Sequence, residues 1–258
     1  MALSLGQISL RKGNRGLLLG GTGSGKSTLA GGSPEYPFHA TLLGDWVQRY
    51  PTGKVIVLDT KPRFRAEWEH TGVSAARRYR RWDHGASIPG AVVVAPGDWL
   101  AFQRGLRRGP VTVISGTDKD AVGMSQMVAR YLETRARASV PSLIYADEVM
   151  DFYGVTGIAK KGTDDTLLHV ARAGRERGVS LLAASQRAKR IPPQLLELVD
   201  RIYLFRLDME DDVKRLPESG FPKGVAPPQE DHMFEYWTKL DRKNVYGPYT
   251  LRMLSATG

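Results

Sequence analysis

The sequence predicts an α/β fold with a mostly parallel sheet and helices on both of its faces. Two observations predict it: short apolar runs bounded by Gly or Pro recur along the chain, and segments with helical spacing of apolar residues lie between them. Such alternation is typical of strand–helix–strand units, whose strands pair in parallel. The 258 residues contain no repeat and no linker rich in Pro, Ser and Gly, so we expect one domain over residues 1–258.

The expected strands are continuous apolar runs, because a parallel sheet buried on both faces gives no alternation. Seven segments fit: residues 15–20, 54–59, 91–95, 111–115, 142–146, 179–184 and 201–207. Together they bound a core of residues 15–207. In the extension 208–258, the segments 233–240 and 245–251 flank a polar turn, which predicts a small C-terminal β-hairpin.

The expected helices cover residues 38–50, 120–137 and 163–177, and a further one opens at Pro192-Pro193. Asp164 and Asp165 would lie in the first turn of the third of these, where acidic residues suit the helix dipole. A short helix begins at Lys26, and the Gly-Gly-Ser-Pro run of residues 31–34 is expected to end it almost at once.

Composition narrows the class of protein. The 37 Lys and Arg against 27 acidic residues give a net charge of +10, which favours a polyanionic partner such as nucleic acid over a merely soluble basic protein. The absence of cysteine excludes disulfides, thiolate zinc sites and a cysteine nucleophile. No apolar run approaches 18 residues and the first 15 residues form no signal core, so we expect a cytoplasmic protein without a membrane segment.

A glycine-rich loop between the first strand and the first helix matches the pattern G-x-x-x-x-G-K-[S/T]. Its glycines let successive backbone N–H groups point at one anion, and the helix start adds its positive dipole end. Lys26 would approach the β- and γ-phosphates, and the Ser27 hydroxyl would bind Mg²⁺. The predicted nucleotide-binding residues are Gly21, Thr22, Gly23, Ser24, Gly25, Lys26, Ser27 and Thr28.

Two acidic residues follow the strand at 142–146, at the sheet edge that would border the nucleotide. Asp147 would hold Mg²⁺ directly or through water, and Glu148 would act as general base on the attacking water. Two surface acids at a loop start are the alternative. A Glu directly after the Asp favours a motor that carries its own base over a small kinase or a GTPase.

The segments ARAGRERGVSLLAASQR (171–187) and RIPPQLLELVDRIYLFRL (190–207) resemble the HerA/FtsK superfamily of DNA-pumping ATPases, as do VIVLDTK (55–61) and GGTGSGKST (20–28). The resemblance spans about residues 15–207. It implies a RecA-like fold of the ASCE class, with an extra strand between the two Walker motifs, and assembly into a homo-oligomeric ring, a hexamer or pentamer. ATP with Mg²⁺ is the implied cofactor.

The resemblance also implies roles for two residues outside the Walker motifs. Gln186 would be a sensor of the γ-phosphate or the attacking water, although a polar residue that merely ends a strand is the alternative. Arg175 would be an arginine finger that enters a neighbour's site. Arg172 and Arg177 remain alternatives for the finger, and helix capping is the plain explanation of all three.

The short chain resembles, within this superfamily, the minimal genome-packaging ATPases of viruses, since no transmembrane block or N-terminal barrel is expected. A capsid vertex or portal is then an expected partner, in the host cytoplasm or on the virion. Double-stranded DNA would be contacted through phosphates, without sequence preference. The candidate DNA-binding residues are Lys61, Arg63, Lys160 and Lys161.

Three functions stay open. The first is an ATP-driven translocase of double-stranded DNA that packages a viral genome. The second is a cellular or plasmid-transfer DNA-processing ATPase of the same superfamily. The third belongs to another class, a nucleotide-switched assembly protein of the virion that pumps nothing; Glu148 and the finger candidate disfavour it, because a switch has less need of both.

Overall fold

The computed structural model describes residues 4–33, 36–61, 64–65, 77–78, 81–82, 88, 90–134, 136–137, 139–153 and 165–251. In these residues one sheet has ten strands in the order β12-β11-β10-β1-β9-β8-β2-β7-β6-β4, and β3 (Phe64–Arg65) pairs separately with β5 (Arg81–Trp82). The seven strands from β10 to β6 are parallel: β10 (Arg201–Leu204), β1 (Arg15–Leu19), β9 (Val179–Ser185), β8 (Ser142–Ala146), β2 (Lys54–Asp59), β7 (Val111–Ser115) and β6 (Val92–Val94).

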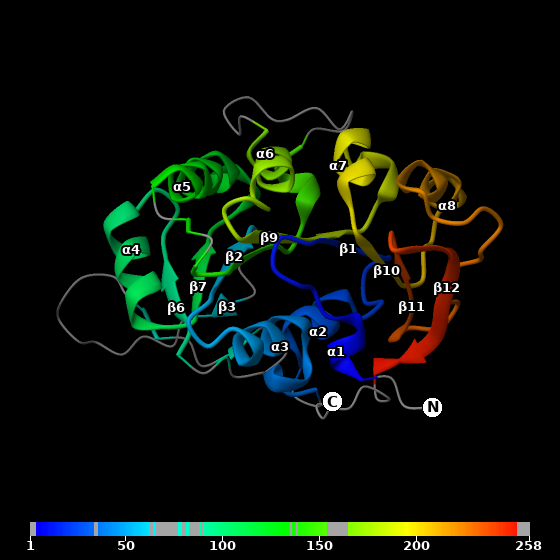
Figure 1. Ribbon diagram of the computed structural model, residues 1–258, viewed down its shortest axis with the longest axis horizontal. Helices are drawn as coiled ribbons and strands as arrows, with labels where there is room; N and C mark the ends of the chain where they lie inside the picture. The colour runs from blue at the N-terminus through cyan, green and yellow to red at the C-terminus, as the bar shows by residue number, and fades with distance from the viewer. Residues whose placement is uncertain are drawn as a thin grey trace.

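Antiparallel strands close the sheet at both ends. β4 (Arg77–Arg78) pairs with β6, and β11 (Met233–Thr238) pairs with β10 and with β12 (Asp241–Thr250). The predicted C-terminal hairpin therefore exists, and it extends the main sheet. Helices cover both faces, as predicted (Figure 1). One face carries α1 (Leu5–Ile8), α2 (Lys26–Gly31) and α3 (Leu42–Arg49); the other carries α4 (Trp99–Arg108), α5 (Ala121–Thr134), α6 (Thr166–Ala173), α7 (Pro193–Leu198) and α8 (Glu210–Arg215).

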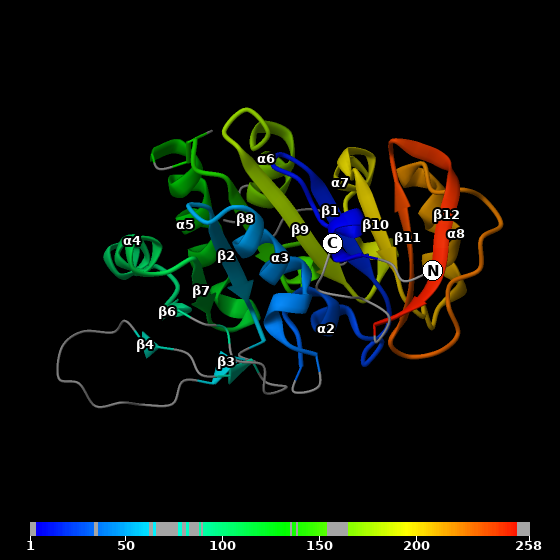
Figure 2. The same cartoon turned by 60° about the horizontal axis from the view of Figure 1, so that its bottom comes forward.

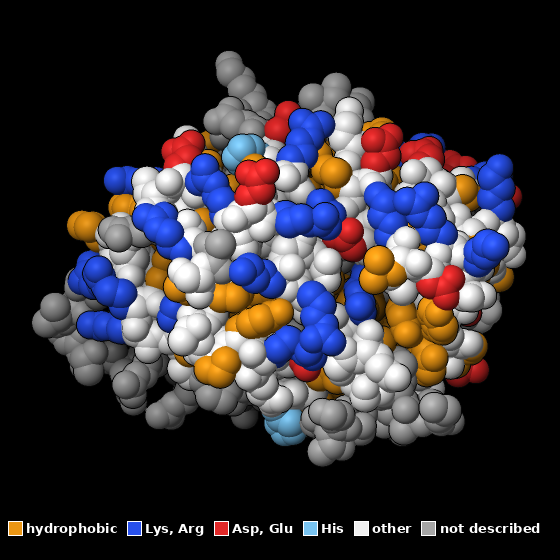
Figure 3. Space-filling model, viewed as in Figure 1, with side chains coloured by type: hydrophobic (Ala, Val, Ile, Leu, Met, Phe, Trp, Pro, Cys, Tyr) orange, Lys and Arg blue, Asp and Glu red, His pale blue; other side chains and the backbone are white. Residues whose placement is uncertain are grey.

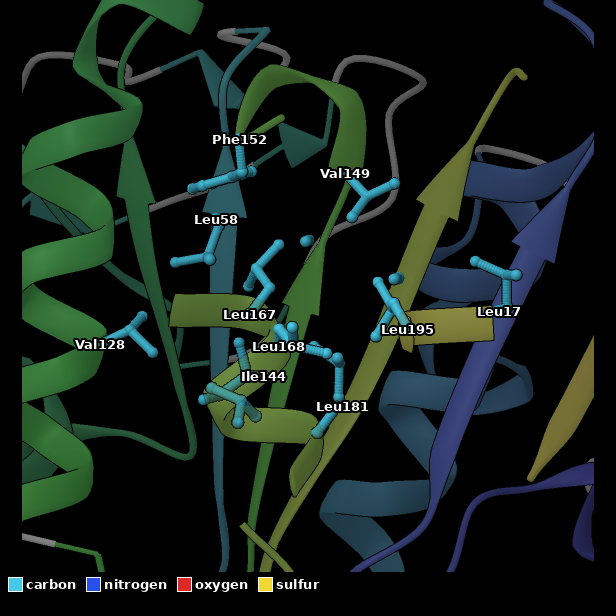
Figure 4. Close-up of a cluster of buried hydrophobic side chains, with 14 of the residues drawn as sticks. Leu17, Leu58, Val128, Ile144, Val149, Phe152, Leu167, Leu168, Leu181 and Leu195 are labelled. Carbon is cyan, nitrogen blue, oxygen red and sulfur yellow. The ribbon is translucent and has the colours of Figure 1, made fainter. Parts of the chain in front are cut away.

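The sheet separates two apolar cores. Leu17 and Leu19 of β1 lie in one core and Leu18 lies in the other, and all three are fully buried. Both faces of the strand therefore need apolar side chains, which explains the continuous apolar runs in the sequence. In Figure 4, Ile144 of β8 and Leu181 of β9 lie beside Leu167 and Leu168 of α6 in the first core.

Helix boundaries differ from the predicted ones. The segment 38–50 forms a 3₁₀ turn, Phe38–Ala40, and then α3, because the Thr41 hydroxyl accepts a hydrogen bond from the N–H of Gly44 and caps a new helix. The third predicted helix is shorter, since α6 begins at Thr166. Asp165 precedes it in a left-handed conformation (φ 50°), so the expected acidic first turn was wrong, and Asp164 lies outside the described residues.

One short helix ends where the sequence predicts, and one helix was not predicted. α2 ends at Gly31 as predicted, and Gly32 follows at φ 98°, a backbone conformation that favours glycine. α4 was not predicted. No helix in the part of the chain that the structure describes has the length and apolar character needed to cross a membrane.

Candidate nucleotide site

The phosphate loop lies where the sequence predicts it, between β1 and α2. It is held by the two strands that flank β1, because the N–H of Gly20 donates to Ser185 at the end of β9 (3.3 Å) and the N–H of Gly21 donates to Arg206 beyond β10 (2.7 Å). A side chain at Gly21 would collide with Asp208, and Gly25 has φ 106° at the start of α2. Figure 2 turns the face with α1, α2 and α3 toward the viewer.

Lys26 is folded back onto its own loop. Its ammonium donates to the carbonyl oxygens of Gly20 (2.6 Å) and Gly21 (2.7 Å). The lysine is buried, so its charge is held in a region of low dielectric beside the turn that would receive phosphates. A cation, the backbone N–H groups of a tight loop and a helix start thus meet at one point, which is an anion-binding arrangement.

Asp147 faces the loop from the end of β8. The Ser27 hydroxyl donates to Asp147 Oδ1 at 3.3 Å, and the phenol of Tyr145 donates to the same oxygen at 2.7 Å. Two octahedral ligands of Mg²⁺ lie about 3 Å apart, so this hydroxyl and carboxylate fit the ion as hard oxygen donors. The described residues contain no group of three or more His, Cys, Asp or Glu side chains that could hold a metal.

Glu148 is almost completely buried next to Asp147. Its carboxylate contacts Lys61, which the sequence analysis names as a candidate DNA-binding residue. Lys61 Nζ lies 3.1 Å from Glu148 Oε2, with the lysine side chain 38% exposed and the glutamate side chain 5% exposed. Burial raises the pKa of Glu148; the Lys61 ammonium opposes that rise, and the nearby Asp151 and Asp147 add to it. Lys61, predicted as a DNA contact, thus lies at the carboxylates, and its DNA-binding role stays a prediction.

Gln186 reaches the same place from β9. The sheet order puts β9 between β1 and β8, so the end of this strand lies between the phosphate loop and the carboxylates. The Thr22 hydroxyl donates to Gln186 Oε1 at 3.1 Å, which leaves the amide nitrogen as the donor for a ligand. The structure therefore brings Gln186 together with the loop, and its role as a sensor stays a prediction.

Arg175 lies just before the start of β9, at the end of the strands opposite to the phosphate loop. Its guanidinium pairs with Asp200 (3.4 Å), its Nε donates to the carbonyl of Gly13 (3.5 Å), and its side chain is 59% exposed. The seven residues of β9 separate it by roughly 20 Å from the loop of its own chain. Arg177 donates to the carbonyl of Leu132, and Arg172 lies exposed on α6.

Other features could not be found from sequence patterns. Tyr145 reads as a core residue of a strand, yet its hydroxyl binds Asp147. The turn before β11 contacts the loop, since the N–H of His232 donates to Ser24 (2.9 Å).

The predicted DNA-binding residues Arg63, Lys160 and Lys161 lie outside the described residues. In Figure 3, Lys and Arg side chains are spread over the visible face among the described residues instead of forming one patch.

The strand order β10-β1-β9-β8-β2, the phosphate loop after β1 and the acidic pair after β8 define the α/β fold of P-loop ATPases. β9 lies between β1, which precedes the phosphate loop, and β8, which precedes the acidic pair, and the HerA/FtsK resemblance implied an extra strand at this place. No family model matches the chain, and no curated protein matches its sequence. Solved structures do match its fold.

One match is the genome packaging NTPase B204 from Sulfolobus turreted icosahedral virus 2. In its complex with sulfate it has a TM-score of 0.56 and 12% identity, with 93% of this chain and 98% of that chain covered. The complex with ATP-gammaS has a TM-score of 0.53, 12% identity and coverage of 91% and 97%. The EccC ATPases 2 and 3 from Thermomonospora curvata have a TM-score of 0.51 and 10% identity, with coverage of 90% of this chain and 35% of that chain. The chain thus shares the α/β fold of these P-loop ATPases.

Proposed function

We propose that the protein is a Mg²⁺-dependent ATPase that moves double-stranded DNA, in the role of a genome-packaging motor. The observation that carries the proposal is the match to B204 over almost the full length of both chains, supported by the 3.3 Å contact between Ser27 of the phosphate loop and Asp147 of the acidic pair. The net charge of +10 supports a polyanionic partner. Residues 1–258 would act as one ATPase domain.

The residues of the site would have separate roles in ATP hydrolysis. Backbone N–H groups of the loop would bind the β- and γ-phosphates, and Lys26 would turn from its carbonyl partners to the phosphate oxygens. Ser27 and Asp147 would hold Mg²⁺, which supplies positive charge at the phosphates. Glu148 would take a proton from the attacking water, and the Gln186 amide would donate to that water or to the γ-phosphate.

Arg175 would complete a neighbour's site. It lies at the end of the strands opposite to its own phosphate loop, and its side chain is more than half exposed. The phosphates that it could reach are therefore those bound by a second copy of the chain. This supports a homo-oligomeric ring, pentamer or hexamer, with the nucleotide at the interface between subunits. Such a ring could seat on a capsid vertex or portal in the host cytoplasm.

A triplex-displacement assay tests the function. A motor that moves along duplex DNA strips off a third strand bound ahead of it, in an ATP-dependent way. We expect displacement by the wild-type protein and none by the Glu148→Gln variant, which should bind ATP and stall. ATP hydrolysis without any displacement would overturn the translocase proposal in favour of the nucleotide-switched assembly protein.

A further inference from the structure

Three consecutive residues where the chain leaves β2 contact residues at or just beyond the ends of both neighbouring strands, β7 and β8. Asp59 accepts a hydrogen bond from Ser115 at the end of β7 (3.0 Å), Thr60 donates to Asp151, and Lys61 pairs with Glu148. β2 and β8 are parallel neighbours with Leu58 opposite Ala146, so the residues that follow them reach the same place at the sheet edge. Strand order, and not sequence proximity, therefore brings Lys61 to Glu148.

The two oxygens of the Glu148 carboxylate have different surroundings. Oε2 is 3.1 Å from the Lys61 ammonium. Oε1 is buried and accepts no hydrogen bond from the residues that the structure describes. Buried polar atoms normally have partners, and one without a partner at a functional site indicates a place for a ligand or water. Oε1 is thus the oxygen that a bound water could reach.

We propose that Lys61 is a positioning residue for ATP hydrolysis, which fixes Oε2 of Glu148 so that Oε1 receives the proton of the attacking water. The proposal rests on the proposed ATPase function. In the step itself, the water oxygen forms a bond to the γ-phosphorus and one water proton passes to Oε1. The bond from that phosphorus to the bridging oxygen breaks, and its electron pair leaves on ADP.

Lysine suits this role for a physical reason. Its ammonium is a compact charge with three donors on a flexible stem, and the stem lets it reach a buried carboxylate from a half-exposed position. Without the Lys61 ammonium, the Glu148 carboxylate would stay buried but lose the contact that fixes its orientation. A general base must lie within hydrogen-bond reach of the proton it takes, so a shift of the carboxylate lowers turnover without touching the phosphate loop.

Steady-state kinetics with Lys61→Met test the proposal, because methionine keeps the apolar stem and removes the charge. We expect kcat to fall about 10- to 100-fold, with the KM for ATP within about twofold of wild type. Lys61→Arg should turn over faster than Lys61→Met. The matched control is Lys54→Met at the other end of β2, where the ammonium donates to the carbonyl of Gly109 (3.3 Å), far from Glu148; it should keep wild-type kcat.

Wild-type kcat in Lys61→Met, with weaker binding of duplex DNA, would overturn the proposal and make Lys61 a DNA contact. Equal turnover of the Met and Arg variants would also contradict it.

Thermal unfolding gives a readout that does not depend on hydrolysis. Lys61→Met should lower Tm by roughly 3–6 °C, and by less than about 1 °C when Glu148 is already Gln, because the ion pair is then absent.

Equal Tm shifts in both backgrounds would show that Lys61 does not anchor Glu148. If the wild-type protein hydrolyses no ATP, the proposed function fails, while the thermal cycle still decides whether the anchor exists. The two failures are therefore distinguishable.

Discussion

The backbone N–H of His232 donates a hydrogen bond to the carbonyl of Ser24 at 2.9 Å, which ties the turn before β11 to the phosphate loop. The carbonyl of His232 in turn accepts from the N–H of Leu251, beyond β12. The start and the end of the C-terminal hairpin are thus tied to the loop through one residue, His232. The hairpin is consequently a support of the nucleotide site, in addition to being an extension of the sheet.

His232 has φ 61°, a left-handed conformation that costs a β-branched residue more than it costs glycine. We predict that His232→Val destabilises the protein by about 1–2 kcal/mol, whereas His232→Gly stays within roughly 0.5 kcal/mol of wild type. Urea unfolding measures both. His232→Val should also weaken binding of a fluorescent ATP analogue, and equal behaviour of the two variants would contradict the role of this backbone.

Arg175→Ala is predicted to lower kcat by about 10³-fold or more while ATP binding is retained, because the finger acts on a neighbour's phosphates. Mixing Arg175→Ala with Lys26→Ala subunits should restore part of the turnover, since an intact site then meets an intact finger at some interfaces. Arg172→Ala is the control and should behave as wild type. Failure of the mixture to exceed the separate proteins would count against a finger in trans.

Gln186→Ala is predicted to lower kcat by about 10²- to 10³-fold, as for loss of one donor to a developing charge. The KM for ATP should change little. Thr22→Val removes the hydroxyl that holds Gln186 Oε1 and should cause a smaller loss. A loss in Gln186→Ala that appears in KM and not in kcat would show that Gln186 serves binding alone.

Tyr145→Phe is predicted to raise the Mg²⁺ concentration that supports half-maximal hydrolysis by about 10-fold, because the phenol orients Asp147. Tyr131→Phe is a matched control: this buried phenol bonds to Ser142, at the other end of β8. It should cost stability without changing the Mg²⁺ requirement. Identical Mg²⁺ titrations for the two variants would exclude Tyr145 from the site.

The strands and the site were predictable to different degrees. Leu17, Leu18 and Leu19 are buried on alternate faces, so the local sequence alone marks a central strand. α4 was missed because its buried face is small, consisting of Ala101, Phe102 and Gly105. Only one of these is a large apolar residue, too weak a signal for a helical pattern.

Contacts between distant segments were not predictable from patterns. The phosphate loop and the Asp147-Glu148 pair are local motifs, and their positions follow from parallel strands that share one edge. The Lys61–Glu148 pair needs β2 beside β8, and the Arg175–Asp200 pair needs the turn before β9 near the start of β10. The sequence pattern therefore predicted Lys61 as a DNA contact, and its pairing with a carboxylate could be seen only in the fold.

The central claim is that ATP hydrolysis is coupled to duplex DNA, and its most direct test is the rate of ATP hydrolysis with and without long double-stranded DNA across a salt series. The account predicts several-fold stimulation that declines steeply as salt rises, because phosphate contacts release counterions. It also predicts no stimulation in the Glu148→Gln variant. Hydrolysis by the wild-type protein at one rate, with or without DNA at low salt, would contradict it.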